Sequence, residues 1–456
     1  MKILLVCPKF SDHIPVGHPE DMDGGTSGIT PLALYILAAL TPEDVDVSIV
    51  NENMGQMDFS EEVDLVGIHV MEHLAPRAKE IARRYRKRGV KVVMGGFYPT
   101  LIPDEAMEES DAIVVGEAEG IWGDLIRDFK AGKLQRVYKR DSYVDMRDVP
   151  IIRKRNIPNG HSLYQVETGR GCPNRCEYCS VTSFHGNRHR VRPIEDVIEQ
   201  IQEIDSDLVS FVDDNIVGNV NYATELFGAL RPLRKLWSAQ CSINIAKSDA
   251  LLRLAADSGC YLLVIGFESL RSEAMRELNK SWAEPDTYAA FVQKIHDAGI
   301  SIIGTFMFGL DHDDKEVFEQ TVSFCIENNI EYPDFHILRP FRGTRLGTRL
   351  LREGRVKKSD LEEVTTSKAH FDPLQMSRLE LEEGWLWSWR EVYSKKGMKN
   401  RLSHILPNSS LFNKRTRSPA DNKTGPWKRG FTREDLIILL NMNTHYYFNE
   451  PKGFVR

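Results

Sequence analysis

The sequence lacks several features that would place the chain in other classes of protein. No apolar stretch reaches the roughly 18 residues that a membrane-spanning helix needs, and the net charge of −7 argues against a general nucleic-acid-binding surface. The seven cysteines are an odd number and four are scattered among apolar residues, so we expect no disulfide framework and a cytoplasmic protein. No G-x-G-x-x-G motif follows the first predicted strand, so a nicotinamide or flavin dinucleotide site is not supported.

The remaining three cysteines, Cys172, Cys176 and Cys179, stand close together with the spacing C-x3-C-x2-C. Three thiolates at this spacing can converge on one inorganic cluster, and a [4Fe–4S] cluster normally takes four cysteine ligands. Three ligands would leave one iron open, and an open position is what distinguishes a catalytic metal centre from a structural one. The alternatives are a redox pair or a structural zinc site, with His185 or His189 as the fourth zinc ligand.

The pattern of apolar runs and helical segments predicts an α/β protein of three domains. Residues 1–145 alternate short apolar runs with helices, which predicts a doubly wound, Rossmann-like parallel sheet. After a charged linker, roughly residues 139–158, six further β/α units over residues 146–370 predict an incomplete (β/α) barrel. Residues 371–456 are predicted to be a helical extension, for example at Leu379–Tyr393 and Arg433–Asn443, with a loop at Leu402–Lys428. This extension would either cap the barrel mouth or pack on its exterior.

Several polar residues follow the predicted barrel strands. The cysteine loop comes after the first strand, Tyr164–Thr168, and so would lie at the C-terminal mouth, where barrel chemistry is found. Asp213 and Asp214 end the second strand, although a helix N-cap with a solvated turn would also explain them. Glu268 ends the fourth, all-apolar strand, where a charged residue is rarely present for packing.

With these motifs the chain resembles a radical S-adenosylmethionine (SAM) enzyme of the subclass with an N-terminal cobalamin-binding domain, over nearly its whole length. In that family the open iron chelates SAM, and an electron from the cluster cleaves SAM to a 5′-deoxyadenosyl radical. The resemblance implies that Cys172, Cys176 and Cys179 are the catalytic cluster ligands. It also implies that Tyr178 packs near the adenine and that the other SAM contacts are Asp213, Asp214, Glu268, Gly304, Phe308 and Arg339.

Two of these positions keep a simpler alternative. The glycines of Ile303–Leu310, which resembles the strand that flanks the adenine, could instead relieve close packing. Arg339 could pair with a carboxylate of SAM or substrate, or form a surface ion pair. The basic segment His185–Arg192 either recognises an anionic substrate or is a solvated loop.

The N-terminal domain matches the cobalamin-binding pattern of the subclass with three departures. Ala33 replaces the glycine of the usual P-L-G, Glu72 stands where a threonine is usual, and Tyr98 replaces the histidine of G-G-x-H-P. The D-x-H-x-x-G motif, which supplies a lower-axial histidine in other cobalamin proteins, is absent. The resemblance implies cobalamin contacts at Glu72, Gly95, Gly96, Tyr98 and Glu117. The alternative is a vestigial domain that has lost the cofactor.

Together these features predict an enzyme: a cobalamin-dependent radical SAM methyltransferase that acts on a small or lipid-like metabolite. Its electrons would come from an external donor of the ferredoxin or flavodoxin type. Without cobalamin, the same cluster would drive cyclisation, dehydrogenation or transfer of another SAM fragment. A non-catalytic iron–sulfur electron carrier would need a saturated cluster and no SAM pocket, and the polar strand ends argue against it.

Overall fold

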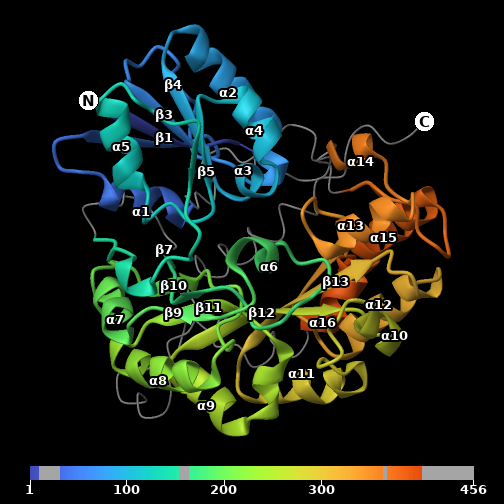
Figure 1. Cartoon of the computed structure of the whole chain (residues 1–456). Coiled ribbons are helices and arrows are strands. Elements are labelled where there is room, and N and C mark those ends of the chain that lie inside the picture. The colour runs from blue at the N-terminus through green and yellow to red at the C-terminus, as the bar shows by residue number, and fades with distance from the viewer. Residues whose placement is uncertain (10–30, 154–163, 363–366, 403–456) are drawn as a thin grey trace.

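The computed structural model describes residues 1–9, 31–153, 164–362 and 367–402. Two parallel α/β sheets, each with its own helices, lie one above the other, and the C-terminal helices lie beside the second sheet (Figure 1). The predicted α/β class, with a Rossmann-like unit followed by an open partial barrel, is confirmed.

The N-terminal unit is a six-stranded parallel sheet in the order β2-β1-β3-β4-β5-β6. Successive residues of each strand point to opposite faces, so Leu4 and Val6 pack under one helical layer and Ile3 and Leu5 under the other. The strand order reverses between β1 and β3, which is the switch point where ligands of such sheets bind. The strands are β1 (Lys2–Cys7), β2 (Asp46–Asn51), β3 (Leu65–His69), β4 (Lys91–Gly95), β5 (Ala112–Val115) and β6 (Val137–Lys139).

The helices of this unit place apolar residues three or four positions apart. In α2, residues Ala78, Ile81, Ala82 and Tyr85 are all buried against the sheet, as an amphipathic helix requires. The helices are α1 (Leu32–Leu40), α2 (Ala75–Lys87), α3 (Phe97–Leu101), α4 (Pro103–Glu109) and α5 (Trp122–Lys130). The segment after β6 is packed rather than free, because Val144, Met146, Val149 and Ile152 form an apolar cluster with α1.

The second unit is an open, parallel six-stranded sheet in the order β14-β13-β12-β11-β10-β7. Its strands are β7 (Tyr164–Val166), β10 (Leu208–Phe211), β11 (Leu236–Cys241), β12 (Cys260–Glu268), β13 (Ser301–Phe308) and β14 (Tyr332–Ile337). The helices that alternate with them are α7 (Ile194–Gln202), α8 (Val220–Leu230), α9 (Asp249–Asp257), α10 (Ser272–Glu277), α11 (Tyr288–Asp297) and α12 (Glu316–Glu327). A short antiparallel pair, β8 (Gly169–Arg170) and β9 (Arg190–Val191), with α6 (Ser180–His185) between them, faces the N-terminal unit.

The C-terminal helices are α13 (Arg345–Arg352), α14 (Lys358–Glu362), α15 (Arg378–Val392) and α16 (Lys395–Leu402). From α15 and the residue that follows it, Trp385 Nε1 donates to the Phe335 carbonyl at 2.7 Å and Tyr393 Oη donates to the Pro333 carbonyl at 2.9 Å. Because these carbonyls belong to β14, α15 covers an edge strand that would otherwise be open. It therefore packs on the barrel exterior, the second of the two expected arrangements. The helix predicted at Arg433–Asn443 lies outside the described residues.

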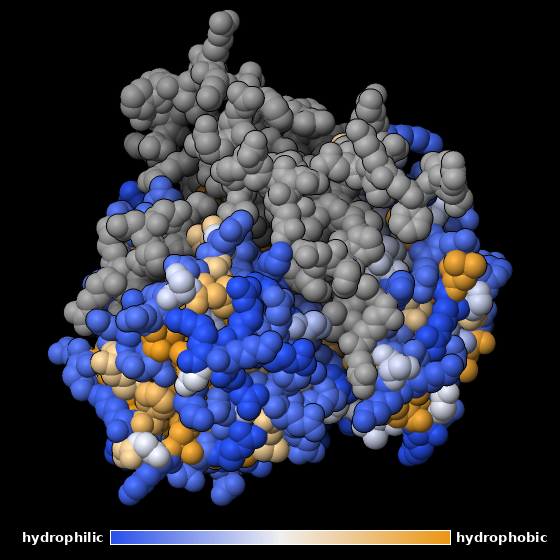
Figure 2. All heavy atoms as spheres, turned by 90° about the horizontal axis from the view of Figure 1, so that it is seen from above, coloured by the Kyte–Doolittle hydropathy of each residue, from blue (hydrophilic) through white to orange (hydrophobic). Residues whose placement is uncertain are grey.

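The described surface carries no long apolar element. Within the described residues, no helix is both long and apolar enough to cross a membrane. Viewed from above, most of the described surface is hydrophilic, with hydrophobic residues in separate patches (Figure 2).

Candidate active site

The three cysteines lie on the loop between β8 and α6, at the carboxyl end of the barrel strands. None forms a disulfide. Burial raises the pKa of all three thiols, that of Cys179 to about 12, and the thiols also affect one another: Cys172 raises the pKa of Cys176, and Cys176 that of Cys179. The thiols are thus neighbours that would stay protonated at neutral pH unless a metal centre took them as thiolates.

This donor set fits an iron–sulfur cluster better than zinc. In the described part of the chain, no three His, Cys, Asp or Glu side chains converge on a site for one metal ion. His185 is bound through Nδ1 to Glu117 at 3.0 Å, and the His189 ring is packed between Gly169 and Gly218. Glu117 thus already binds one of the two candidate fourth ligands, and neither histidine forms a metal site with the three cysteines among the described residues. A [4Fe–4S] cluster needs only one thiolate on each of three irons, and three soft sulfur donors supply that.

A buried polar contact joins the cysteine loop to the end of the fourth barrel strand. Lys280 Nζ donates to Glu268 Oε1 at 2.6 Å and to the Gly266 carbonyl at 2.9 Å, and Tyr178 Oη donates to the same Glu268 oxygen at 2.8 Å. Glu268 lies at a register shift of β12 and has a φ of 62°. Both members of the pair are buried, with Glu268 7% and Lys280 5% exposed. The charge of Lys280 lowers the pKa of the Cys172 and Cys176 thiols, against the larger effect of burial. Sequence reasoning missed Lys280 because α10 separates it from every motif.

The two predicted acids after the second strand have different surroundings. Asp213 is 1% exposed and accepts hydrogen bonds from Thr168 N at 3.0 Å and Thr168 Oγ1 at 2.6 Å. Both carboxylate oxygens of Asp213 are therefore used in linking the end of β10 to the end of β7. Burial raises the pKa of Asp213 to about 7. Asp214 accepts from Gly171 N at 2.9 Å, next to Cys172, and lines a cavity. The structure thus gives Asp213 a structural contact and leaves Asp214 at the site.

Three other residues were predicted to contact SAM, namely Gly304, Phe308 and Arg339. The first two lie away from the inner face of the barrel, and the third packs against an aromatic ring. A Cβ on Gly304 would lie 3.1 Å from Ile330 Cγ2, and Phe308 is fully buried with its ring centroid 5.5 Å from that of Phe335. Both belong to the core under the outer helices, so close packing explains the glycine. Arg339 lies over the ring of Phe341 at 5.3 Å.

The inner face of the last strand carries a titratable pair that sequence reasoning also missed. Asp334 and His336 alternate with the buried core residues of β14, and their side chains are 38% and 56% exposed. His336 Nε2 lies 3.2 Å from Asp334 Oδ2. Although the surrounding barrel wall partly desolvates the ring and lowers the pKa of His336, the charges of Asp334 and Glu268 raise this pKa above its usual value. The pair therefore faces the same interior as Glu268.

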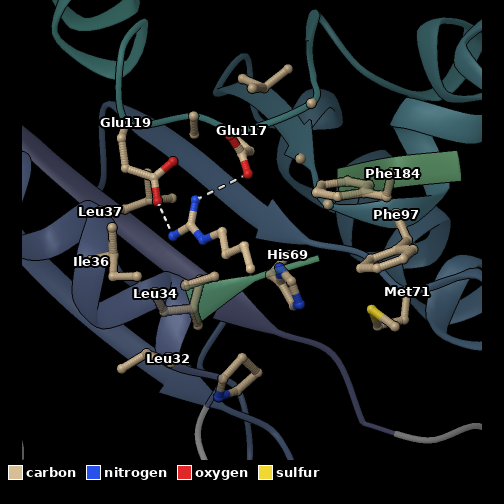
Figure 3. A pocket seen from close by; sticks show the side chains of 18 of the residues that line it. Leu32, Leu34, Ile36, Leu37, His69, Met71, Phe97, Glu117, Glu119 and Phe184 are labelled. Atoms are coloured by element: carbon tan, nitrogen blue, oxygen red, sulfur yellow. Dashed lines mark hydrogen bonds and ion pairs between the residues drawn. The ribbon is translucent and has the colours of Figure 1, made fainter. Parts of the chain in front are cut away.

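A cavity of about 520 Å³ lies between the two units (Figure 3). Its walls are the side chains of α1, the carboxyl ends of β3, β4 and β5, and Arg170, Phe184, His185 and Asp214 from the barrel side. Gly95, Gly96 and Gly116 line it, and Gly96 has φ +107°, with a Val70 carbonyl 2.9 Å from where a Cβ would stand. Backbone exposed in this way at the carboxyl edge of the sheet fits the close approach of a nucleotide tail, as cobalamin requires.

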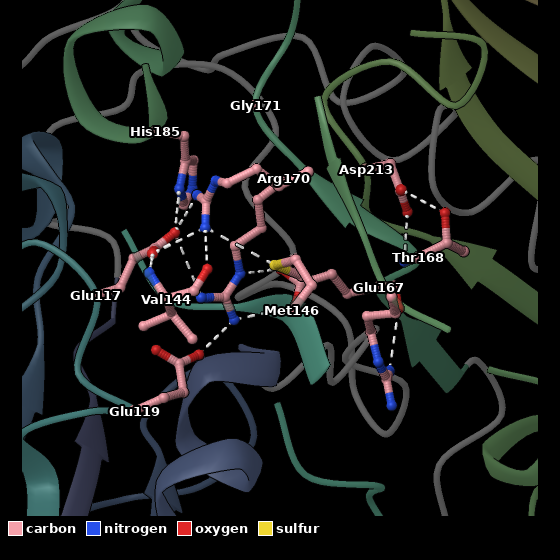
Figure 4. Close-up of polar contacts among 12 residues, drawn as sticks. Glu117, Glu119, Val144, Met146, Glu167, Thr168, Arg170, Gly171, His185 and Asp213 are labelled. Atoms are coloured by element: carbon pink, nitrogen blue, oxygen red, sulfur yellow. Dashed lines mark hydrogen bonds and ion pairs between the residues drawn. The ribbon is translucent and has the colours of Figure 1, made fainter. Parts of the chain in front are cut away.

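Charged residues close the cavity on the barrel side (Figure 4). Glu117 accepts from Arg190 Nη1 at 3.0 Å and contacts His185, while Arg170 bonds Glu119 and, through Nε, Glu167 at 2.7 Å. Burial alone would raise the pKa of Glu117, but His185, Arg190 and Arg170 lower it well below its usual range. The basic segment His185–Arg192 is therefore neither a solvated loop nor a free anion site, because its His185 and Arg190 bind the N-terminal unit.

Glu72 and Tyr98 are absent from the cavity lining, in contrast to the prediction that they contact cobalamin. Glu72 is buried and accepts a hydrogen bond from Arg342 Nε at 3.0 Å. Arg342 Nη1 also donates to Glu105 at 2.6 Å. Tyr98 is fully buried, with its hydroxyl 3.4 Å from Glu105. The carboxylate at position 72 thus meets an arginine from the loop after β14, a contact between domains that only the folded chain creates.

His69 is a further cavity residue that sequence reasoning did not single out. It ends β3, lines the cavity, and makes no hydrogen bond or ion pair among the described residues. Burial lowers the pKa of His69 to about 4, so the imidazole is neutral at neutral pH. The segment Gly67–His73 contains two histidines at the carboxyl edge of the predicted sheet, and no motif in the sequence tells which of them lines the cavity.

Comparison with known proteins gives consistent matches to both units. Residues 166–325 match the radical SAM superfamily, and residues 26–126 match the B12 binding domain. The chain is 30% identical over 416 residues to the bacteriochlorophyllide d C-12(1)-methyltransferase of Chlorobaculum tepidum, covering 88% of this chain and 89% of the relative. It is 26% identical to the hopanoid C-2 methylase of Rhodopseudomonas palustris, over 79% of this chain and 72% of that protein.

Two solved structures share the fold. The radical SAM methyltransferase TsrM from Kitasatospora setae superposes with a TM-score of 0.65 at 18% identity, covering 87% of this chain and 84% of TsrM. The cobalamin-dependent SAM radical enzyme OxsB superposes with a TM-score of 0.64 at 13% identity, covering 89% of this chain and 70% of OxsB. Both resemble the chain across the two units together.

Proposed function

The chain belongs to the radical SAM superfamily, in the subclass with an N-terminal cobalamin-binding domain, and we propose that it methylates a carbon atom of a large apolar metabolite. Its cofactors are a [4Fe–4S] cluster, SAM and cobalamin. The relatives named above act on a bacteriochlorophyllide and a hopanoid, which are both extended apolar molecules. A lipid-like or tetrapyrrole-like substrate is therefore the class we propose.

The observation that carries this proposal is that the cobalamin cavity adjoins the cysteine loop. Asp214 lines the cavity and, through its bond to Gly171 N, also holds the residue that precedes Cys172. When bound, the cluster supplies the electron that cleaves SAM, and cobalamin carries the methyl group. Because the two sites adjoin, SAM bound at the cluster would lie close to the cobalamin and to a substrate held between them.

The chain's own residues would bind and orient the reactants. Glu268 is a carboxylate at the barrel mouth, and hydrogen bonds from Lys280 and Tyr178 fix its position. A carboxylate held in this way can accept hydrogen bonds from the amino or hydroxyl groups of SAM. Asp334 and His336 face the same interior from β14 and offer a charge-assisted donor to a substrate oxygen. The ion pairs of Glu117 and Arg170 hold the two units together and limit the entry of water.

The test is anaerobic reconstitution with iron, sulfide and hydroxocobalamin, followed by turnover with SAM bearing a trideuterated methyl group. A reductant of the ferredoxin or flavodoxin type supplies the electrons, and magnesium chlorins and hopanoids are offered as substrates. We expect a product that gains a trideuterated methyl group, with S-adenosylhomocysteine and 5′-deoxyadenosine formed in equal amounts.

The control is Cys176→Ala, which should lose the cluster absorbance and 5′-deoxyadenosine formation together. If the wild type forms 5′-deoxyadenosine but retains no corrin absorbance and methylates nothing, the methyl-transfer proposal is wrong and the cobalamin-independent alternative holds. If Cys176→Ala keeps the cluster, the ligand assignment is wrong.

A further inference from the structure

His69 occupies a position in the cobalamin cavity that no role has yet explained. It is the last residue of β3, the strand beside the switch point of the N-terminal sheet, and it pairs in register with Gly95 of β4. Figure 3 shows its ring in the cavity wall, between the aliphatic side chains of α1 and the pair Met71 and Phe97.

The charged side chains of the described lining already have partners. Glu117 and Glu119 are ion-paired with arginines, His185 is bound to Glu117, and Asp214 accepts from backbone. His69 differs because neither ring nitrogen makes a hydrogen bond within the described residues. Neutral imidazole is the commonest metal-binding side chain in proteins, and a nitrogen that no protein group occupies is available for a metal.

We propose that His69 is the axial ligand of the cobalamin cobalt on the face turned toward the N-terminal sheet. The opposite face must stay open toward the barrel, because the cysteine loop and the SAM site lie on that side. The nitrogen lone pair would replace water or the cofactor's own dimethylbenzimidazole, and no proton has to leave because the ring is already neutral. This inference rests on cobalamin binding, as in the proposed function.

This arrangement needs no D-x-H-x-x-G motif. The histidine would come from the end of β3 rather than from that motif. Gly96 supports the arrangement, because a Cβ at this residue would stand 3.3 Å from His69 Nδ1 and crowd the ring. An axial nitrogen donor is one of the means by which a protein tunes the electronics of a metal cofactor.

The experiment is electron paramagnetic resonance of the cobalamin-loaded holoprotein, reduced to cobalt(II), with the protein labelled with 15N-histidine and the cobalamin unlabelled. A histidine ligand splits each cobalt line into a doublet, whereas dimethylbenzimidazole, with natural 14N, gives a triplet. We expect the doublet. A triplet, or no nitrogen splitting, would overturn the proposal.

Variants identify which histidine is bound. His69→Gln and His69→Asn should lose the doublet, while His73→Gln, four residues further along the chain and outside the cavity lining, should keep it. A doublet that survives in both His69 variants would assign the ligand to another histidine and refute the proposal. Corrin absorbance retained after gel filtration reports cobalamin binding separately, so a wrong ligand is distinguishable from a failure of the proposed function.

Discussion

Replacing Lys280 by methionine should destabilise the barrel strongly, because it leaves the buried carboxylate of Glu268 without its cation. The substitution keeps the length of the side chain but removes the bonds from Nζ to Glu268 Oε1 at 2.6 Å and to the Gly266 carbonyl at 2.9 Å. Glu268, at 7% exposure, would keep only the Tyr178 hydroxyl as a donor. Removing one partner of a buried ion pair costs about 3–5 kcal/mol, and we expect a loss of stability in that range.

The assay is urea unfolding of the cluster-free protein, followed by tryptophan fluorescence and circular dichroism. Lys294→Met is the matched control, since Lys294 pairs with Asp249 on the surface with side chains 44% and 59% exposed, and we expect no measurable change. The double variant Lys280→Met with Glu268→Gln should recover part of the loss, because the stranded charge is gone. If Lys280→Met shifts the midpoint no more than Lys294→Met, or if the double variant recovers nothing, the buried pair is not the cause.

Three further predictions follow from the same contacts. Gly96→Ala, at φ +107° and with a carbonyl 2.9 Å from the new Cβ, should cost about 1–3 kcal/mol and reduce the corrin absorbance retained after gel filtration, whereas Gly55→Ala, with nothing within 4 Å, should not. Asp213 holds its proton up to a pKa of about 7 in the folded chain but only to 3.8 when unfolded. The folded state thus binds more protons between these values, and stability should fall by up to about 4 kcal/mol as pH rises through that window. Urea midpoints across pH should show this slope, and Asp213→Asn should abolish it. Arg342→Ala should leave Glu72 buried without its cation and lower the thermal midpoint, and adding Glu72→Gln should restore part of it; a midpoint unchanged by Arg342→Ala would mean that this ion pair does not stabilise the domain interface.

The sequence by itself determined the features that depend on neighbours along the chain. Alternating apolar runs and helical periods fix strands and helices locally, so the two parallel sheets were predictable. The spacing of Cys172, Cys176 and Cys179 is likewise a local property, because one short loop must bring the three thiols to one cluster. Gly95 and Gly96 could be predicted at the cavity because the carboxyl end of a strand in such a sheet is where ligands bind.

The tertiary structure decided which polar side chains meet, since these contacts join residues far apart in the sequence. Glu72 was predicted to contact cobalamin, yet it binds Arg342, 270 positions along the chain. Lys280 and His69 belong to no motif, and only the packing of β12 on the cysteine loop and the cavity beside β3 show their surroundings. A sequence pattern can place a side chain at a strand end, but burial and the nearest opposite charge, which settle its protonation and its partner, are properties of the assembled domains.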